Sequence, residues 1–177
     1  MPNTLICPCC GENRIMESEN GVFRCPFCRT SFRRDDEECL ASSFRNLTFD
    51  LKKLGEDRVR IMLLSQKNGE GKLFRVFVAD RPPVSGDLSA DDWRRIASVI
   101  FCKAHFECWK QTSYDPDIVD GMMWNLTVSF ERKHSMTCHG CNGYPPYWND
   151  VIEALAFSFE AAGLSPSSFL SKRKEPS

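Results

Sequence analysis

The chain has 177 residues, of which 42% are hydrophobic, and its 23 basic side chains nearly balance its 24 acidic ones, giving a formal charge of −1. This length allows one ordinary domain plus a small module, and the near-neutral charge argues against general binding to polyanions. No apolar run approaches the roughly 18 residues of a membrane-spanning helix, and the start Met1-Pro2-Asn3-Thr4 lacks the features of a targeting peptide. We therefore expect a globular protein of the cytoplasm.

Ten cysteines are present, and four of them form two CxxC pairs near the N-terminus. The pairs are Cys7-Pro8-Cys9-Cys10 and Cys25-Pro26-Phe27-Cys28, with residues 11–24 between them. Each CxxC turn brings two sulfurs close together, so two such turns deliver four thiolates, a ligand set that suits tetrahedral Zn²⁺. Because no export signal is recognised, we interpret the other cysteines as reduced thiols rather than disulfides.

The residues between and after the CxxC pairs have the pattern of a short antiparallel sheet. Strands are predicted at 14–17 and 21–24 around a turn marked by Asn20-Gly21, and a third strand is predicted at 30–32. A sheet this small has no core of its own, so metal binding would supply its folding energy.

This layout, together with the sequence Cys7-Pro8-Cys9-Cys10-Gly11, resembles the zinc-ribbon family over residues 5–32. The resemblance implies a single structural zinc ion and leaves Cys9 facing outward as a bystander. Its implied metal ligands are Cys7, Cys10, Cys25 and Cys28.

The chain is predicted to continue from this ribbon, residues 1–34, through a charged linker, residues 35–45, into an α+β domain, residues 46–165. In the α+β domain, residues that alternate between apolar and polar predict strands, and apolar residues at helical spacing predict helices. The predicted order is strands at 47–52, 59–63 and 73–78, a helix at 89–107, strands at 124–131 and 135–139, and a helix at 148–163. We therefore predict an antiparallel sheet backed by two helices (βββ-α-ββ-α), followed by a flexible tail at 166–177.

Three stretches of the larger domain, Leu88–Trp93, Asp120–Val128 and Gly143–Trp148, carry a second resemblance. They are similar to a sheet-and-helix domain found in uncharacterised bacterial proteins and in lipoproteins. The resemblance implies one antiparallel sheet backed by two helices, and it implies no activity. The chain differs from the lipoproteins because it carries the ribbon where they carry a signal and a lipobox.

The remaining thiols and histidines gather in two places, around the first predicted helix and before the second. They are Cys102, His105 and Cys108, and then His134, Cys138, His139 and Cys141. Cys102, Cys108, Cys138 and Cys141 could form a second zinc site, but we favour core thiols because cysteine is commonly buried as a small hydrophobe. Cys138 and Cys141 could instead be a redox pair, although the helix after them begins too late to lower their pKa.

The sequence carries no nucleophile elbow, phosphate-binding loop or zinc-protease helix, so we predict that the protein is not an enzyme. We predict a zinc-binding, non-enzymatic binding or adaptor protein, whose ribbon is a recognition module for a protein partner. One alternative is nucleic-acid binding, with ribbon arginines on phosphates and Phe23, Phe27 or Phe32 stacked on a base. Another is a thiol-redox enzyme that uses Cys138 and Cys141. The ribbon arginines are Arg14, Arg24, Arg29, Arg33 and Arg34.

Overall fold

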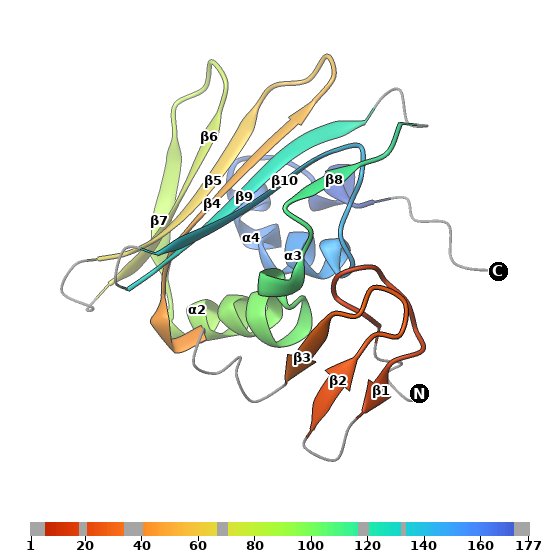
Figure 1. The fold of residues 1–177 in the computed structure, drawn as a ribbon. Coiled ribbons are helices and arrows are strands. Elements are labelled where there is room, and N and C mark those ends of the chain that lie inside the picture. The colour runs from red at the N-terminus through yellow and green to blue at the C-terminus, as the bar shows by residue number, and fades with distance from the viewer. Residues whose placement is uncertain are drawn as a thin grey trace.

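The computed structural model of the chain is mixed α+β, as the sequence predicts, and contains two separate β-sheets (Figure 1). It describes residues 6–17, 21–33, 41–66, 71–116, 121–131 and 134–171. A three-stranded sheet lies within residues 6–33, which we call the N-terminal segment. A seven-stranded sheet and the helices that cover it lie within residues 41–171, which we call the main segment.

The small sheet consists of β1 (Met16–Glu17), β2 (Val22–Arg24) and β3 (Ser31–Arg33), which are antiparallel and follow in that order. The three strands lie within the regions predicted for them or one residue beyond. Gly21 enters β2 with a φ of 67°, a left-handed conformation that glycine adopts without steric penalty. The predicted turn before it, residues 18–20, lies outside the described residues.

The large sheet has the strand order β7-β6-β5-β4-β9-β10-β8. Its strands are β4 (Phe44–Lys53), β5 (Val59–Ser65), β6 (Lys72–Val78), β7 (Val84–Leu88), β8 (Thr112–Tyr114), β9 (Met122–Phe130) and β10 (Ser135–Cys141). Neighbouring strands are antiparallel except β8 and β10, which run parallel. Along β4, Leu47, Phe49 and Leu51 are all fully buried, which confirms the alternation that predicted a strand with one covered face.

The two edge strands, β7 and β8, were not predicted. The sequence before β7 contains Pro82-Pro83, and Gly86 lies within it, so we expected the sheet to end there; edge strands tolerate such residues. Gly86 pairs with Phe74, and a Cβ at Gly86 would lie only 2.6 Å from the Phe74 ring, so the aromatic ring occupies the space of a side chain. β8 was missed because it has three residues and shows no apolar alternation.

The first predicted helix is shorter than expected and changes its hydrogen-bonding pattern. It starts at α2 (Ala90–Ala97), where the Ser89 hydroxyl accepts a hydrogen bond from the Asp92 N–H at 3.0 Å, as the predicted cap requires. It continues as the π-helix η1 (Ser98–Lys103) and is followed by the 3-10 helix η2 (Phe106–Cys108). The predicted end at Glu107 was wrong because His105 has a φ of 48° and ends the helix.

The second predicted helix is two short helices, α3 (Trp148–Ala154) and α4 (Ala156–Ala161). The 3-10 helix η3 (Pro166–Phe169) follows, within the region predicted as a flexible tail. Phe169 is buried and stacks on Phe159 with ring centroids 4.7 Å apart, so this part of the predicted tail packs on α4. Residues 172–177 lie outside the described residues. Among the helices that are described, we find none long and apolar enough to span a membrane.

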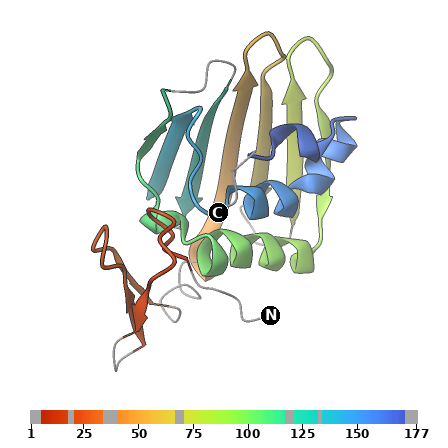
Figure 2. The ribbon, with the colours of Figure 1, turned by 90° about the vertical axis from the view of Figure 1, so that its right-hand side faces the viewer.

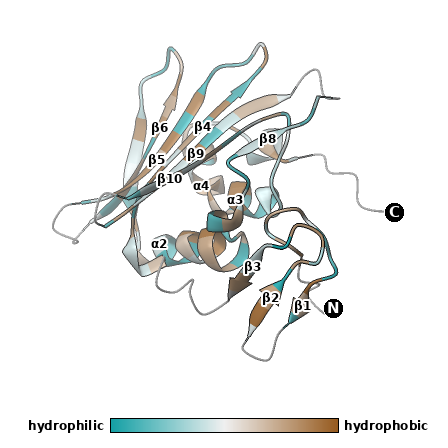
Figure 3. Ribbon diagram, in the orientation of Figure 1, coloured by the Kyte–Doolittle hydropathy of each residue, from teal (hydrophilic) through white to brown (hydrophobic). Residues whose placement is uncertain are grey.

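The helices lie against one face of the large sheet (Figure 2), and the core fills the space between these two layers. The largest fully buried side chains come from both layers and include Phe44 and Phe49 from the sheet and Phe101, Trp148 and Phe159 from the helices. Hydrophobic and hydrophilic residues are interspersed along the strands and helices (Figure 3), as expected for elements with one covered face.

Candidate metal centre

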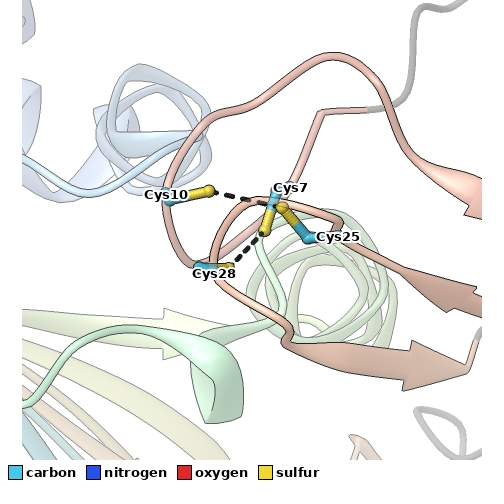
Figure 4. Close-up of side chains that lie close together, drawn as sticks. All are labelled: Cys7, Cys10, Cys25 and Cys28. Carbon is cyan, nitrogen blue, oxygen red and sulfur yellow. Dashed lines mark hydrogen bonds between the residues drawn. The ribbon is translucent and has the colours of Figure 1, made fainter.

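The four predicted ligand residues come together at one end of the N-terminal segment, in the two CxxC turns (Figure 4). The Sγ atoms of Cys7 and Cys28 lie 3.5 Å apart, and those of Cys10 and Cys25 lie 3.6 Å apart. Each of these close pairs joins one turn to the other. All four sulfurs lie within 4.8 Å of one another, and Cys7 and Cys25 are fully buried.

These distances fit a tetrahedral zinc–thiolate centre. With Zn–S bonds of about 2.3 Å, the edges of a sulfur tetrahedron are about 3.8 Å long. The observed separations of 3.5 and 3.6 Å, with an upper limit of 4.8 Å, bracket that edge length. The donor set is entirely sulfur, which favours zinc over hard cations such as Mg²⁺ or Ca²⁺. The residues present therefore form a possible site for one zinc ion.

The two turns have the same backbone hydrogen bonds. In the first, which we call the first knuckle (residues 7–12), Gly11 N–H donates to the Cys7 carbonyl at 2.8 Å. In the second knuckle (residues 25–30), Arg29 N–H donates to the Cys25 carbonyl at 2.9 Å. The Cys7 and Cys25 N–H groups also donate to the carbonyls of the last residues of their knuckles, at 2.7 and 3.0 Å. Each knuckle thus holds its two cysteines in the same relative position.

The knuckles differ in the residue that follows the second cysteine. Gly11 has a φ of 80° and Arg29 has a φ of 64°, so both occupy the left-handed region. Glycine adopts this conformation freely, whereas an L-residue with a Cβ loses roughly 1–2 kcal/mol there. The second knuckle therefore contains backbone strain that the first one avoids.

The protonation of the thiols depends on burial and on their hydrogen bonds. Burial raises the pKa of Cys7 and that of Cys10. Burial also raises the pKa of Cys28, but its hydrogen bonds with Thr30, Cys10 and Cys7 together outweigh this effect and lower the pKa to about 6. A metal bound here would therefore displace protons from Cys7 and Cys10.

Two contacts place the N-terminal segment on the main segment. The Tyr147 hydroxyl donates to the Ile6 carbonyl at 3.2 Å and accepts from the Ile6 N–H at 3.3 Å, next to the candidate ligand Cys7. The Phe32 ring packs on the His105 ring, with centroids 4.7 Å apart. Burial raises the pKa of Tyr147, so its hydroxyl keeps its proton at neutral pH. We did not predict either contact, and no local sequence pattern indicates them.

The candidate second site is not assembled. Among the residues that the structure describes, the only group of three or more potential metal ligands is the Cys7, Cys10, Cys25 and Cys28 cluster. Cys138 and Cys141 both lie in the extended strand β10, at positions that face opposite sides of the sheet. His105, which we considered beside Cys102, instead packs on Phe32 of the N-terminal segment.

The same strand geometry is unfavourable for a disulfide between Cys138 and Cys141. Three steps along a strand separate their Cα atoms by about 10 Å, whereas a disulfide requires about 7 Å or less. Both residues pair with β9, so β10 would have to unfold locally before they could meet. Burial also raises the pKa of Cys138 to about 11, which keeps the thiol protonated and unreactive at neutral pH.

The surface of the N-terminal segment exposes two large hydrophobic side chains. Phe27, at the tip of the second knuckle, is 77% exposed, and Met16 in β1 is 57% exposed. Phe32, which we considered for base stacking, is only 5% exposed because it packs between Phe23 and His105. Of the aromatic residues considered for base stacking, Phe27 is therefore the most accessible to a partner.

Comparison of the chain with protein-family models, with curated proteins and with solved structures finds no match. The likeness of the N-terminal segment to a zinc ribbon therefore depends on the geometry of its cysteine cluster. The likeness of the main segment to bacterial sheet-and-helix domains stays a prediction from sequence.

Proposed function

We propose that the protein binds one structural Zn²⁺ through Cys7, Cys10, Cys25 and Cys28 and acts as a non-enzymatic binding or adaptor protein. The metal assignment rests on the sulfur cluster. Its Sγ atoms form close pairs, 3.5 and 3.6 Å apart, between two knuckles that have the same backbone hydrogen bonds. Reduced thiolates in this number suit a reducing compartment, so we place the protein in the cytoplasm.

We further propose that the zinc-stabilised N-terminal segment recognises a protein partner. It projects from the large sheet and its helices in both views (Figures 1 and 2), which leaves the exposed Phe27 and Met16 accessible. Exposed aromatic side chains on a rigid support are frequent anchors of protein interfaces. The metal would serve this role by holding the second knuckle, and with it Phe27, in one conformation.

Metal analysis of the purified full-length protein is the first test, and one zinc per chain is expected. The recognition role is tested by affinity capture with Phe27→Asp, compared with Phe77→Asp on the large sheet, where Phe77 is 37% exposed. Only Phe27→Asp should remove the captured partner, while both variants keep their zinc. Equal capture by wild type and Phe27→Asp would contradict the recognition role, and hydrolase or oxidoreductase activity in a substrate panel would contradict the non-enzymatic assignment.

Nucleic-acid binding through the same surface is a second candidate, favoured by the exposed Phe27, Arg24 and Arg29 in one small segment. Arginine can contact phosphates while a nearby aromatic ring stacks on a base. A labelled single-stranded oligonucleotide should then bind in a salt-dependent manner, and the double variant Arg24→Glu with Arg29→Glu should abolish binding. Arg75→Glu, on the exposed side of β6, is the matched control. Binding that survives the double variant would reject this candidate.

A further inference from the structure

A large cleft lies where the two segments meet. Its volume is about 1590 Å³. One wall is the first knuckle, through Cys9 and Cys10; another is β8; and a third is the loop Tyr144–Pro146. Residues of and after η3, including Ser167 and Ser171, line a further side.

The strand β8 gives this cleft an unpaired sheet edge. β8 is the last strand in the order of the large sheet, with β10 on one side and, within the described residues, no strand on the other (Figure 2). An edge strand presents backbone N–H and C=O groups that can pair with another extended chain. Because Thr112, Ser113 and Tyr114 all line the cleft, an extended segment lying in it would run beside this edge.

The hydrogen-bond register identifies which backbone groups face outward. His139 N–H donates to the Gln111 carbonyl at 3.0 Å, and Asp115 N–H donates to the Cys141 carbonyl at 3.2 Å. In a parallel pair, alternate residues of a strand bond to the same neighbour, so residues 111, 113 and 115 face β10. The peptide groups of Thr112 therefore face the open edge, and a strand added there would bond to them.

The side chains of the cleft favour an acidic occupant. Among the described residues that line it are Lys53 and Lys110, against one acidic side chain, that of Asp115. Lys53 Nζ lies 3.8 Å from Glu56 Oε1, an exposed pair that offsets part of its charge, and 5.6 Å from the centroid of the Phe169 ring. The cleft also exceeds the roughly 300–1,000 Å³ of sites that enclose drug-sized molecules, so it suits a chain segment better than a small ligand.

We propose that this cleft binds an extended acidic peptide segment, which pairs with β8 at Thr112 and places its carboxylates near Lys53 and Lys110. This site goes beyond the recognition role of Phe27, since Phe27 does not line the cleft. It depends on the same metal, however, because the wall formed by Cys9 and Cys10 belongs to the first knuckle. Zinc loading thereby completes the peptide site.

The test is a selection of random eight-residue peptides displayed on phage, with the zinc-loaded full-length protein as the target. Enriched peptides should combine Asp or Glu with β-branched residues. They are then synthesised with a fluorescent label, and their affinities are measured by fluorescence anisotropy. Enrichment of basic or purely apolar peptides, or no enrichment, would overturn the proposal.

Two variants of the edge separate strand addition from other modes of binding. Thr112→Pro removes the outward N–H without removing a bond to β10, whereas Thr112→Val keeps that N–H and serves as the matched control. Both lose the contact between the Thr112 hydroxyl and His139 Nε2, 3.1 Å apart. We expect Thr112→Pro to weaken the selected peptides at least tenfold and Thr112→Val to leave their affinity within about twofold.

The double variant Lys53→Glu with Lys110→Glu should also weaken binding at least tenfold, and Phe27→Asp should leave it unchanged. Thermal melting and zinc content verify that each variant is folded. Peptides that bind Thr112→Pro as tightly as the wild type would show that the edge of β8 is not the site. Loss of peptide binding in Phe27→Asp alone would assign it to the proposed recognition surface instead.

Discussion

The N-terminal segment and the main segment bury their residues in different ways. In the N-terminal segment the buried side chains include two of the candidate zinc ligands, Cys7 and Cys25, together with Phe32. All of the largest fully buried side chains belong to the main segment. A segment whose interior consists largely of cysteine sulfurs would depend on a bound metal for its stability, whereas the main segment has enough apolar burial to fold without one.

Replacing one candidate ligand tests this difference between the segments most strongly. Cys25→Ser should release the zinc and unfold the N-terminal segment, because zinc capture supplies on the order of 10 kcal/mol that its few apolar contacts cannot replace. The main segment should still melt cooperatively. Metal analysis and amide hydrogen exchange measure the two effects separately.

Cys9→Ser is the control, since Cys9 is not part of the four-cysteine cluster and the variant should keep its zinc. The contrast fails if Cys25→Ser also abolishes the cooperative melting of the main segment. A zinc content of two per chain in the wild type would contradict the one-site assignment.

The reverse experiment weakens the main segment only. Phe49→Ala should destabilise it by about 3–5 kcal/mol, because Phe49 is fully buried and the substitution leaves a cavity. The Phe49 ring meets the Trp148 ring edge-on with centroids 5.4 Å apart, so this contact is lost as well. Chemical denaturation measures the change, and zinc content should not change. Loss of zinc in the folded variant would show that the two segments are not independently stabilised.

The same contrast explains what the sequence could predict. The clustering of Cys7, Cys10, Cys25 and Cys28 could be predicted from sequence because a CxxC turn fixes the positions of its sulfurs through local backbone bonds, such as that from Gly11 N–H to the Cys7 carbonyl. Strand β4 was predicted because one covered face forces apolar residues to alternate with polar ones. Both features depend on neighbours in sequence.

Features that depend on distant residues were not predicted. The contact between Tyr147 and Ile6 joins positions 141 residues apart, and neither residue has a local pattern that indicates it. The strand β8 is recognised only by its pairing with β10, since three polar residues at a sheet edge need not alternate. The cleft was missed for the same reason, because its lining residues come from six separate parts of the chain.

Acidification should weaken metal binding while it leaves the main segment folded. Burial raises the pKa of Cys7 and Cys10, so both thiols are protonated near neutral pH before zinc binds and must lose their protons in the complex. The complex therefore holds fewer protons than the free site, and zinc affinity rises with pH and falls as pH falls. Release of these two protons alone corresponds to about a hundredfold in affinity per pH unit.

Below pH about 6 the dependence should steepen, because Cys28 then also carries a proton before zinc binds. Competition with a chelator of known pH dependence, from pH 5.5 to 8, measures the slope. A zinc affinity that does not change over this range would contradict the assignment of thiolate ligands.

The contact between Tyr147 and Ile6, which joins the two segments, can be weakened without changing the buried side chains of either segment. Tyr147→Phe removes the hydroxyl that bonds to both backbone groups of Ile6, a loss of about 1–2 kcal/mol. Zinc should stay bound, but amide exchange in residues 6–17 should accelerate because Ile6, just before the first knuckle, loses its attachment to the residue that precedes α3. Tyr114→Phe, at a residue that is 67% exposed, is the control and should leave exchange in residues 6–17 unchanged. Unchanged exchange in Tyr147→Phe would show that the contact of Phe32 with His105 suffices to dock the segment.

The smallest expected effect compares the two knuckles with each other. Arg29 has a φ of 64° and occupies the same place in its knuckle as Gly11, whose φ is 80°, and both donate the equivalent backbone hydrogen bond. Arg29→Gly should remove the steric penalty of the Cβ and stabilise the zinc-bound segment by up to about 1 kcal/mol, part of which is offset by the greater freedom of glycine in the unfolded chain.

A stabilisation of this size would tighten zinc binding by about two- to fivefold in the chelator competition. The reciprocal variant, Gly11→Ala, should weaken binding by a similar factor because it introduces the strain that Arg29 already carries. Weaker zinc binding in both variants would contradict this expectation. It would mean that contacts of the Arg29 side chain stabilise the second knuckle by more free energy than the backbone strain at Arg29 costs. The equivalence of the two knuckles would then be limited to their backbone hydrogen bonds.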